Sequence, residues 1–171
     1  MLYHGTTIGG LSIIKANAKS HTSEKTVAYF TEDRCYALVC CRTREENFVT
    51  MGLRGDGKQH YFERFPNQLK KLYGGKRGYI YTIAAADGLV NTKGHTWESE
   101  TDVSVHRCEI VDDVYAEILK EEQAGNIVIH RYLEIDPIEQ QQNANYMKEH
   151  IDDQGEEMRR FYLTHFSSLW D

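Results

Sequence analysis

Two short runs of strand-forming residues, each with a polar end, constrain the fold of this chain most. Leu2–Thr7 and Thr26–Thr31 have the pattern of a strand that opens into a turn. In the first run, His4 stands directly before Gly5, which has no side chain to block a ligand at the backbone. In the second run, Tyr29 offers a ring that can stack on a flat ligand. We therefore take these two strand ends as the start of a candidate site.

Length and composition indicate a folded chain of the size of one domain. The chain has 171 residues, 40% of them hydrophobic, and only two prolines, which favours a globule with a true core. The net charge of −6 disfavours nucleic acid as an electrostatic partner. No apolar run approaches the ~20 residues of a membrane span, and no secretory leader is visible. We therefore expect a cytoplasmic protein with no membrane association.

The cysteines and histidines predict neither a metal site nor a disulfide framework. Three of the four cysteines fall in one predicted helix, and no Cys-x-x-Cys pair occurs. The histidines also lack the spacing of metal ligands. We therefore expect no metal ion and thiols that are reduced and mostly buried. The four cysteines are Cys35, Cys40, Cys41 and Cys108.

The order of the predicted elements favours an α+β fold, because strands and helices mix without regular βαβ alternation. Beyond the two opening runs, we expect strands at 78–84, 103–105 and 127–129 with a brief edge strand at 89–90, helices at 8–14, 32–41, 67–73 and 113–125, and loops at 17–25, 49–59 and 91–100. Thr6 or Thr7 is the predicted cap of the first helix and Thr31 that of the second.

The composition shifts from Asp136 and Pro137 onward. This pair suits the cap and first turn of a helix, and the apolar residues that follow recur at helical spacing. They are Ile138, Tyr146, Ile151, Met158, Phe161, Tyr162, Phe166 and Leu169. We therefore expect a core over residues 1–135 and a C-terminal extension of amphipathic helices over 136–171, bent near Gly155 and packed on the core or on a partner protein.

A third stretch, Trp97–Glu100, supplies two carboxylates at a spacing of two residues. On an extended chain both side chains face the same side. A fixed carboxylate lowers the barrier to cleavage of an N-glycosidic bond, because the transition state carries positive charge at the anomeric carbon. Together with a histidine that orients a sugar hydroxyl and an aromatic ring that stacks on a heterocycle, this set suits a nicotinamide riboside unit.

These residues carry a family resemblance. Tyr3–Thr6 resembles the first motif of ADP-ribosyltransferase-fold proteins of the His-Tyr-Glu branch, which includes diphtheria toxin and the poly-ADP-ribose polymerases, and Val27–Thr31 is similar to their second. Trp97–Glu100 resembles the position of the third motif. It also resembles the Glu-x-Glu pair of arginine-modifying toxins, which carry Arg in place of His in the first motif. The resemblance implies a single domain with a split, curved, mixed β core flanked by helices.

The resemblance also implies an activity. NAD would be the co-substrate, and ADP-ribose would pass to a protein side chain, a nucleic-acid base, a small molecule or water. Glu100 would be the catalytic glutamate because it immediately precedes the strand at 103–105, with Glu98 as the alternative. The other implied roles are His4 on the ribose, the Gly5 backbone on the carboxamide, Thr6 near the adenosine, and Tyr29 with Tyr36 as a second wall on the nicotinamide.

Three alternatives stay open at this point. RNA 2′-phosphotransferases also carry a His-Gly-Thr first motif and use NAD, but they need basic residues to grip RNA, and the acidic total counts against them. A second alternative is a non-catalytic module of the same fold that binds NAD or ADP-ribose and docks a partner through the tail. The third is a structural domain in which the motifs have no function.

Overall fold

The computed structural model describes all of the chain except residues 44–47, 84–87 and 166–171. The protein is α+β with mixed sheets, as the order of elements predicts. The predicted end of a strand at residue 84 and the apolar tail positions Phe166 and Leu169 lie outside the described residues.

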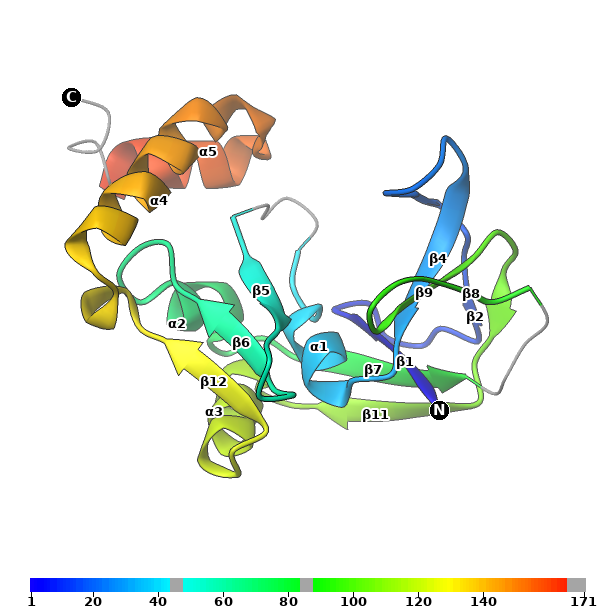
Figure 1. Cartoon of the computed structure of the whole chain (residues 1–171). Helices are drawn as coiled ribbons and strands as arrows, with labels where there is room; N and C mark the ends of the chain where they lie inside the picture. Colours follow the sequence, from blue (N-terminus) through cyan, green and yellow to red (C-terminus); the bar gives the residue numbers. More distant parts are fainter. Residues whose placement is uncertain (44–47, 84–87, 166–171) are drawn as a thin grey trace. The chain divides into compact units, whose positions relative to one another are not determined.

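The chain divides into two compact units, each built from two separate segments (Figure 1). The first unit holds Met1–Arg42 and Gly75–Ile118, and the second holds Thr43–Gly74 and Leu119–Asp171. Helix α3 (Val114–Gln123) crosses the boundary. This helix begins where the sequence predicts, since the Asp113 carboxylate accepts a hydrogen bond from the Ala116 backbone at 3.1 Å.

An antiparallel sheet of seven strands is the main part of the first unit. Six strands follow the order β11-β7-β1-β4-β9-β8, and β3 pairs with β4 as well. Their bounds are β1 Leu2–Thr6, β3 Ala18–Lys19, β4 Thr26–Thr31, β7 Gly78–Ile83, β8 Val90–Lys93, β9 Thr96–Ser99 and β11 Arg107–Val111. The side chains of its core include Ala28, Phe30, Tyr81 and Ile83, all at most 3% exposed. The strands predicted in the runs Leu2–Thr7 and Thr26–Thr31 are confirmed by β1 and β4, and the strand predicted at 78–84 is confirmed over its described residues, 78–83.

The sheet is split between β1 and β4. Strand β1 pairs with β7 over five residues, whereas a single pair, Tyr3 with Thr31, joins β1 to β4. Further back along the same edge, β3 pairs with Val27 and Thr26 of β4. The intervening stretch of β4, residues 28–30, therefore has no strand beside it on that edge among the described residues. The candidate site lies at this opening.

Helix α1 (Arg34–Val39) packs closely on β1 at Gly5. A Cβ atom on Gly5 would lie 1.7 Å from the carbonyl oxygen of Ala37, which no side chain tolerates. The sequence predicts that the missing side chain of Gly5 leaves room for a ligand. In the structure, the backbone of α1 at Ala37 takes up this space. The absence of that side chain lets the backbone of the helix contact the strand.

The predicted helix at 8–14 is wrong. The backbone at residues 8–11 instead wraps around the hydroxyl of Tyr81, which donates to the Ile8 carbonyl at 2.9 Å and accepts from the Leu11 backbone at 3.2 Å. Gly10 has φ = +74°, a left-handed conformation that breaks a helix. Beyond it, β2 (Ile13–Ile14) pairs with β10 (Val103–Ser104), the strand predicted at 103–105.

The predicted loop at 91–100 is also wrong, because it contains most of the β8–β9 hairpin. Gly94, with φ = +57°, makes the tight turn between the two strands. The sequence did not predict this turn because the pattern of polar residues around it indicates a loop. The brief edge strand predicted at 89–90 overlaps β8 at Val90, and β8 does end the sheet. Strand β11 was not predicted because most of its residues are polar or exposed, as suits an edge strand, although Val111 is buried. Ile110 is 60% exposed, and the Glu109 carboxylate pairs with Arg34.

Two local predictions near β4 are wrong in detail. The cap of α1 is Asp33, whose carboxylate accepts from the Tyr36 backbone at 3.0 Å. Thr31 is the last residue of β4, and its hydroxyl accepts from the Asp33 backbone at 3.1 Å. The predicted loop at 17–25 contains β3, whose two residues pair with the start of β4.

A smaller, three-stranded mixed sheet lies in the second unit. Strand β5 (Thr50–Leu53) pairs antiparallel with β6 (Gln59–Phe62), and β12 (Ile127–His130) pairs parallel with β6. The predicted loop at 49–59 is therefore largely a hairpin, whose turn uses Gly57 at φ = +77°. The predicted strand at 127–129 and the helix at 67–73 are confirmed by β12 and by α2 (Gln68–Tyr73).

The tail forms two helices, α4 (Pro137–Glu149) and α5 (Glu156–His165), drawn in orange and red in Figure 1. The Asp136 carboxylate caps α4 through the Ile138 backbone at 2.8 Å. The tail packs on the second unit, where the ring of Tyr162 lies 4.9 Å from that of Phe48 and 5.3 Å from that of Phe65. Helices α4 and α5 belong to the same compact unit as β5, β6 and β12. No helix in the described ranges is long and apolar enough to cross a membrane.

Two histidines and an aspartate form a chain of hydrogen bonds on the second unit's sheet. His60 Nδ1 lies 2.9 Å from His130 Nε2, and His60 Nε2 lies 3.0 Å from the Asp56 carboxylate. The His130 ring also stacks on Phe62 at 4.2 Å. Burial first, and then the charge of His60, lowers the pKa of His130. Folding therefore disfavours the protonated form of His130.

We expect stability to fall when the pH drops below the ordinary histidine pKa of ~6.5. The unfolded chain then binds a proton that folded His130 resists, so protonation favours unfolding. The pKa of Asp56 is lowered, chiefly by the hydrogen bond from His60, so its own contribution is lost only below the ordinary Asp value of ~4. Denaturation at pH 7.5 and pH 5 should show a smaller pH dependence in His130→Gln than in the wild type. The control His106→Gln changes an exposed histidine and should keep the wild-type pH dependence. An equal change in the free energy of unfolding between the two pH values in all three proteins would contradict the prediction.

Gly5→Ala should destabilise the protein by ~1–3 kcal/mol or more, the range for overpacking, because the new methyl group meets the Ala37 carbonyl. Gly52→Ala is the matched control, since it changes a strand glycine with open space around its Cβ position. Urea denaturation followed by circular dichroism measures both variants. A Gly5→Ala protein as stable as Gly52→Ala would show that α1 does not approach β1 so closely.

Candidate functional site

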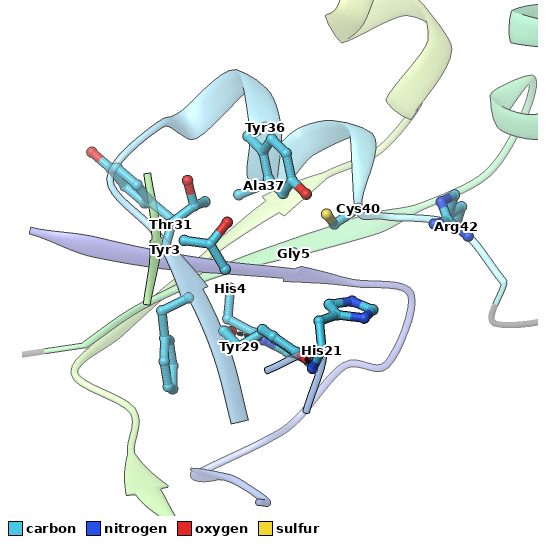
Figure 2. Close-up of a pocket in the computed structure, with 12 residues that line it drawn as sticks. Tyr3, His4, Gly5, His21, Tyr29, Thr31, Tyr36, Ala37, Cys40 and Arg42 are labelled. Atoms are coloured by element: carbon cyan, nitrogen blue, oxygen red, sulfur yellow. Dashed lines mark hydrogen bonds between the residues drawn. The ribbon is translucent and has the colours of Figure 1, made fainter. Parts of the chain in front are cut away.

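A hollow of about 290 Å³ opens in the first unit beside β1, β4 and α1 (Figure 2). We call it the ring-walled hollow. Its volume lies at the lower end of the ~300–1,000 Å³ typical of small-molecule sites, so it suits one end of a larger ligand. The residues that line it are Tyr3, His4, Gly5, His21, Tyr29, Phe30, Thr31, Tyr36, Ala37, Cys40, Arg42 and Thr96.

The ring-walled hollow brings together four of the predicted site residues: His4, Gly5, Tyr29 and Tyr36. Thr6 is not among its lining residues; its hydroxyl accepts a hydrogen bond from the Ile8 backbone at 3.2 Å and shapes the turn after β1. The two predicted glutamates also lie outside it.

His4 occupies the opening between β1 and β4. Its Nδ1 lies 2.8 Å from the backbone carbonyl of Tyr29, at the stretch of β4 that has no neighbouring strand on that edge in the described part of the chain. A carbonyl only accepts hydrogen bonds, so Nδ1 must carry the proton. In the neutral ring the lone pair is then on Nε2. The His4 side chain thus makes the hydrogen bond that a neighbouring strand would otherwise make, and this bond determines the tautomer of the ring.

Aromatic rings stand on two sides of Gly5. In Figure 2, Tyr36 extends from α1 on one side, and the rings of Tyr29 and His21 lie on the other. The Tyr29 and His21 rings are 5.3 Å apart with a tilt of 34°. Burial is the main cause that raises the pKa of both tyrosines. Their phenols therefore stay neutral at physiological pH, and the hollow presents two uncharged faces to a flat ring.

The lining of the ring-walled hollow favours an anionic group near Arg42. Arg42 supplies the positive charge, and none of the described lining residues carries a carboxylate. Cys40 lines it as well, but burial raises the pKa of its thiol to about 11, and that of neighbouring Cys41 to about 12. These thiols stay protonated at neutral pH, so neither acts as a nucleophile there.

Glu98 and Glu100 line a second hollow of about 600 Å³ in the same unit, which we call the carboxylate hollow. Glu98 is only 6% exposed. Its two oxygens accept hydrogen bonds from Ser20 Oγ at 2.9 Å and Thr92 Oγ1 at 3.3 Å. Glu100 follows β9, is exposed, and pairs with Lys25 at 2.6 Å. The two carboxylates share one hollow, as their spacing predicts, but only Glu98 is buried.

Tyr29 and Glu98 are direct cross-strand partners on β4 and β9. Because the Tyr29 carbonyl faces His4, it points away from β9. The pair is therefore of the non-hydrogen-bonded kind, in which side chains on one face lie closest together. The negative charge of Glu98 accordingly adds to the burial that raises the Tyr29 pKa. Tyr29 lines the ring-walled hollow, and Glu98 lines the carboxylate hollow.

Sequence reasoning missed three residues of this region: Ser20, His21 and Arg42. The first two sit in the polar segment predicted as a loop, and Arg42 follows the end of α1. Nothing in their local pattern signals a site, because only the pairing of β3 with β4 brings the segment alongside Tyr29 and Glu98.

Comparisons with models of known protein families, with curated proteins and with solved structures returned no match. Within the described part of the chain, no three His, Cys, Asp or Glu side chains gather closely enough to hold a metal ion.

We expect Cys108, which is exposed, to react with iodoacetamide well before Cys40 and Cys41. At pH 8, a pKa of about 11 leaves roughly a thousandth of the Cys40 thiol ionised, and only the thiolate reacts. Peptide mass spectrometry after timed alkylation of the native and the urea-unfolded protein measures each site. Labelling of native Cys40 as fast as of Cys108 would contradict the raised pKa.

Proposed function

We propose that this protein is an NAD-dependent ADP-ribosyltransferase that breaks the N-glycosidic bond of nicotinamide and transfers ADP-ribose to an acceptor. The observation that carries the proposal is the Tyr29–Glu98 pair. It sets a buried carboxylate beside an aromatic wall, at the point where His4 fills the opening of the sheet. The residues of all three motifs, far apart in the sequence, converge there.

The ring-walled hollow fits the nicotinamide end of NAD. Its volume of about 290 Å³ suits a ring and a sugar rather than a whole dinucleotide. A nicotinamide ring would lie between Tyr36 and Tyr29, with the Gly5 backbone at its carboxamide and His4 Nε2 accepting from a ribose hydroxyl. Arg42, on the lining of the same hollow, supplies positive charge for the pyrophosphate.

The reaction needs little beyond these groups. The bond between the anomeric carbon and the nicotinamide nitrogen breaks, and its electron pair neutralises the pyridinium ring, which leaves. A lone pair of the acceptor then forms the new bond to the anomeric carbon, and the acceptor loses a proton. The sugar carries positive charge between these events, and a fixed carboxylate stabilises it. Tyr29 stacks on the leaving ring until it departs.

Glu98 suits the catalytic role better than Glu100, which the sequence favoured. It is buried, it lies opposite Tyr29, and two hydroxyls hold its oxygens. Charge acts more strongly where water is excluded. Glu100, exposed and paired with Lys25, is screened by solvent and suits contact with an acceptor. Glu98→Gln keeps the shape and removes the charge, with one acceptor oxygen in place of two, so it separates the two assignments.

Glu98→Gln should lower the rate of nicotinamide release from NAD by ~100- to 1,000-fold, the typical cost of removing one stabilising group, with NAD still bound. Glu100→Gln should change the rate of NAD hydrolysis by less than about fivefold, because its charge is exposed. His4→Ala should weaken NAD binding. Chromatography of released nicotinamide and calorimetric titration with NAD measure these effects. Glu24→Gln, an exposed glutamate near Lys25, is the matched control.

The outcomes separate the alternatives. Loss of nicotinamide release in Glu100→Gln but not in Glu98→Gln would reverse the assignment of the glutamates. NAD binding without turnover, across trial acceptors that include protein extract and oligonucleotides, would favour the non-catalytic module. A wild-type protein that does not bind NAD at millimolar concentration would overturn the proposal.

A further inference from the structure

Ser20 makes the shortest hydrogen bond to the buried Glu98 carboxylate. Its side chain is itself buried, at 5% exposure, and its Oγ lies 2.9 Å from Glu98 Oε2. The other carboxylate oxygen contacts Thr92 Oγ1 at 3.3 Å, from the edge strand β8. The Ser20 contact is therefore the tighter of the two.

The hydrogen bonds around Ser20 fix the direction of its proton. A serine hydroxyl has one proton and two lone pairs. The backbone N–H groups of Thr22 and Ser23 both donate to Oγ, each at 3.1 Å, and so occupy the lone pairs. The Thr22 hydroxyl lies 3.2 Å away, but a carboxylate is the stronger acceptor. The Ser20 proton therefore points at Glu98.

The residues on either side of Ser20 hold Tyr29. The Tyr29 hydroxyl donates to the Lys19 carbonyl at 3.0 Å and accepts from the His21 backbone at 2.9 Å. The segment is itself anchored on β4, because Lys19 pairs with Thr26. It is closed by the Ser20 backbone, which donates to the Lys25 carbonyl at 2.9 Å. Of these three consecutive residues, Lys19 and His21 thus contact Tyr29, and Ser20 contacts Glu98.

We propose that Ser20 is the positioning residue of the reaction, and that Lys19–His21 sets the Glu98 carboxylate relative to the aromatic wall. The inference rests on the proposed function and deepens it. The Ser20 hydroxyl donates its proton to Glu98, so it acts through Glu98 rather than on NAD. Without its hydroxyl, the carboxylate loses its closest donor and is free to turn away from the anomeric carbon. The chemical step then slows while NAD binding is kept.

The test compares three substitutions at one position. Ser20→Val removes the hydroxyl, Ser20→Thr keeps it with nearly the same shape as Val, and Ser20→Ala removes it without added bulk. Ser23→Ala is the control, since Ser23 belongs to the same turn and its hydroxyl accepts from the Lys25 backbone. For each variant, calorimetry gives the Kd of NAD, nicotinamide release gives kcat, and thermal denaturation reports folding.

We expect kcat to fall roughly tenfold to hundredfold in Ser20→Ala and Ser20→Val, the range for a lost hydrogen bond to a charged group. The Kd of NAD should change by less than about twofold. Ser20→Thr should recover most of the rate, and Ser23→Ala should match the wild type. The difference in kcat between Ser20→Thr and Ser20→Val is the decisive result, because the two side chains fill the same volume and only one carries a hydroxyl.

Failure of this inference is distinguishable from failure of the proposed function. An active wild type whose kcat survives in both Ser20→Ala and Ser20→Val overturns the positioning role alone. So does a Ser20→Thr protein that folds and is as slow as Ser20→Val, or a loss of NAD affinity equal to the loss of kcat. A wild type that binds no NAD overturns the proposed function, and this inference with it.

Discussion

A single backbone pair, Tyr3 with Thr31, joins the two halves of the main sheet, and the candidate site depends on this constraint. Because β1 leaves β4 after one pair, residues 28–30 keep an open edge, and a side chain rather than a strand must satisfy the Tyr29 carbonyl there. His4 does so. The close approach of α1 at Gly5 then places Tyr36 across the opening. A complete sheet would have closed the ring-walled hollow.

The burial of the Glu98 carboxylate is the second feature on which the candidate site depends, and by itself it is unfavourable. A carboxylate out of water is tolerated only with hydrogen-bond donors around it, and Ser20 and Thr92 supply them. Both donors come from segments adjacent to the sheet edges. The exposed Glu100, by contrast, is satisfied by a surface ion pair of the kind that contributes little to stability. Burial, more than sequence spacing, distinguishes the two glutamates.

Much of the fold can be predicted from local sequence patterns, and the wrong predictions share one cause. Strands β4 and β7 and helices α3 and α4 were predicted because their own residues carry strand propensity or caps. The helix predicted at 8–14 failed because Tyr81, from β7, draws this backbone around its hydroxyl. Strand β11 and the β8–β9 hairpin were missed because strands of largely polar residues gain their structure from a neighbouring strand rather than from their own composition.

The sequence by itself determined the α+β class, the strand ends that carry His4 and Tyr29, and the capped start of the tail at Asp136. These follow from properties of single segments, such as propensity, capping and spacing. Only the tertiary structure decided that Gly5 contacts a helix, that Ser20 reaches Glu98, and that Glu98 rather than Glu100 is buried opposite Tyr29. Each of these depends on strand register and burial, which arise when distant segments pair and which no single segment encodes.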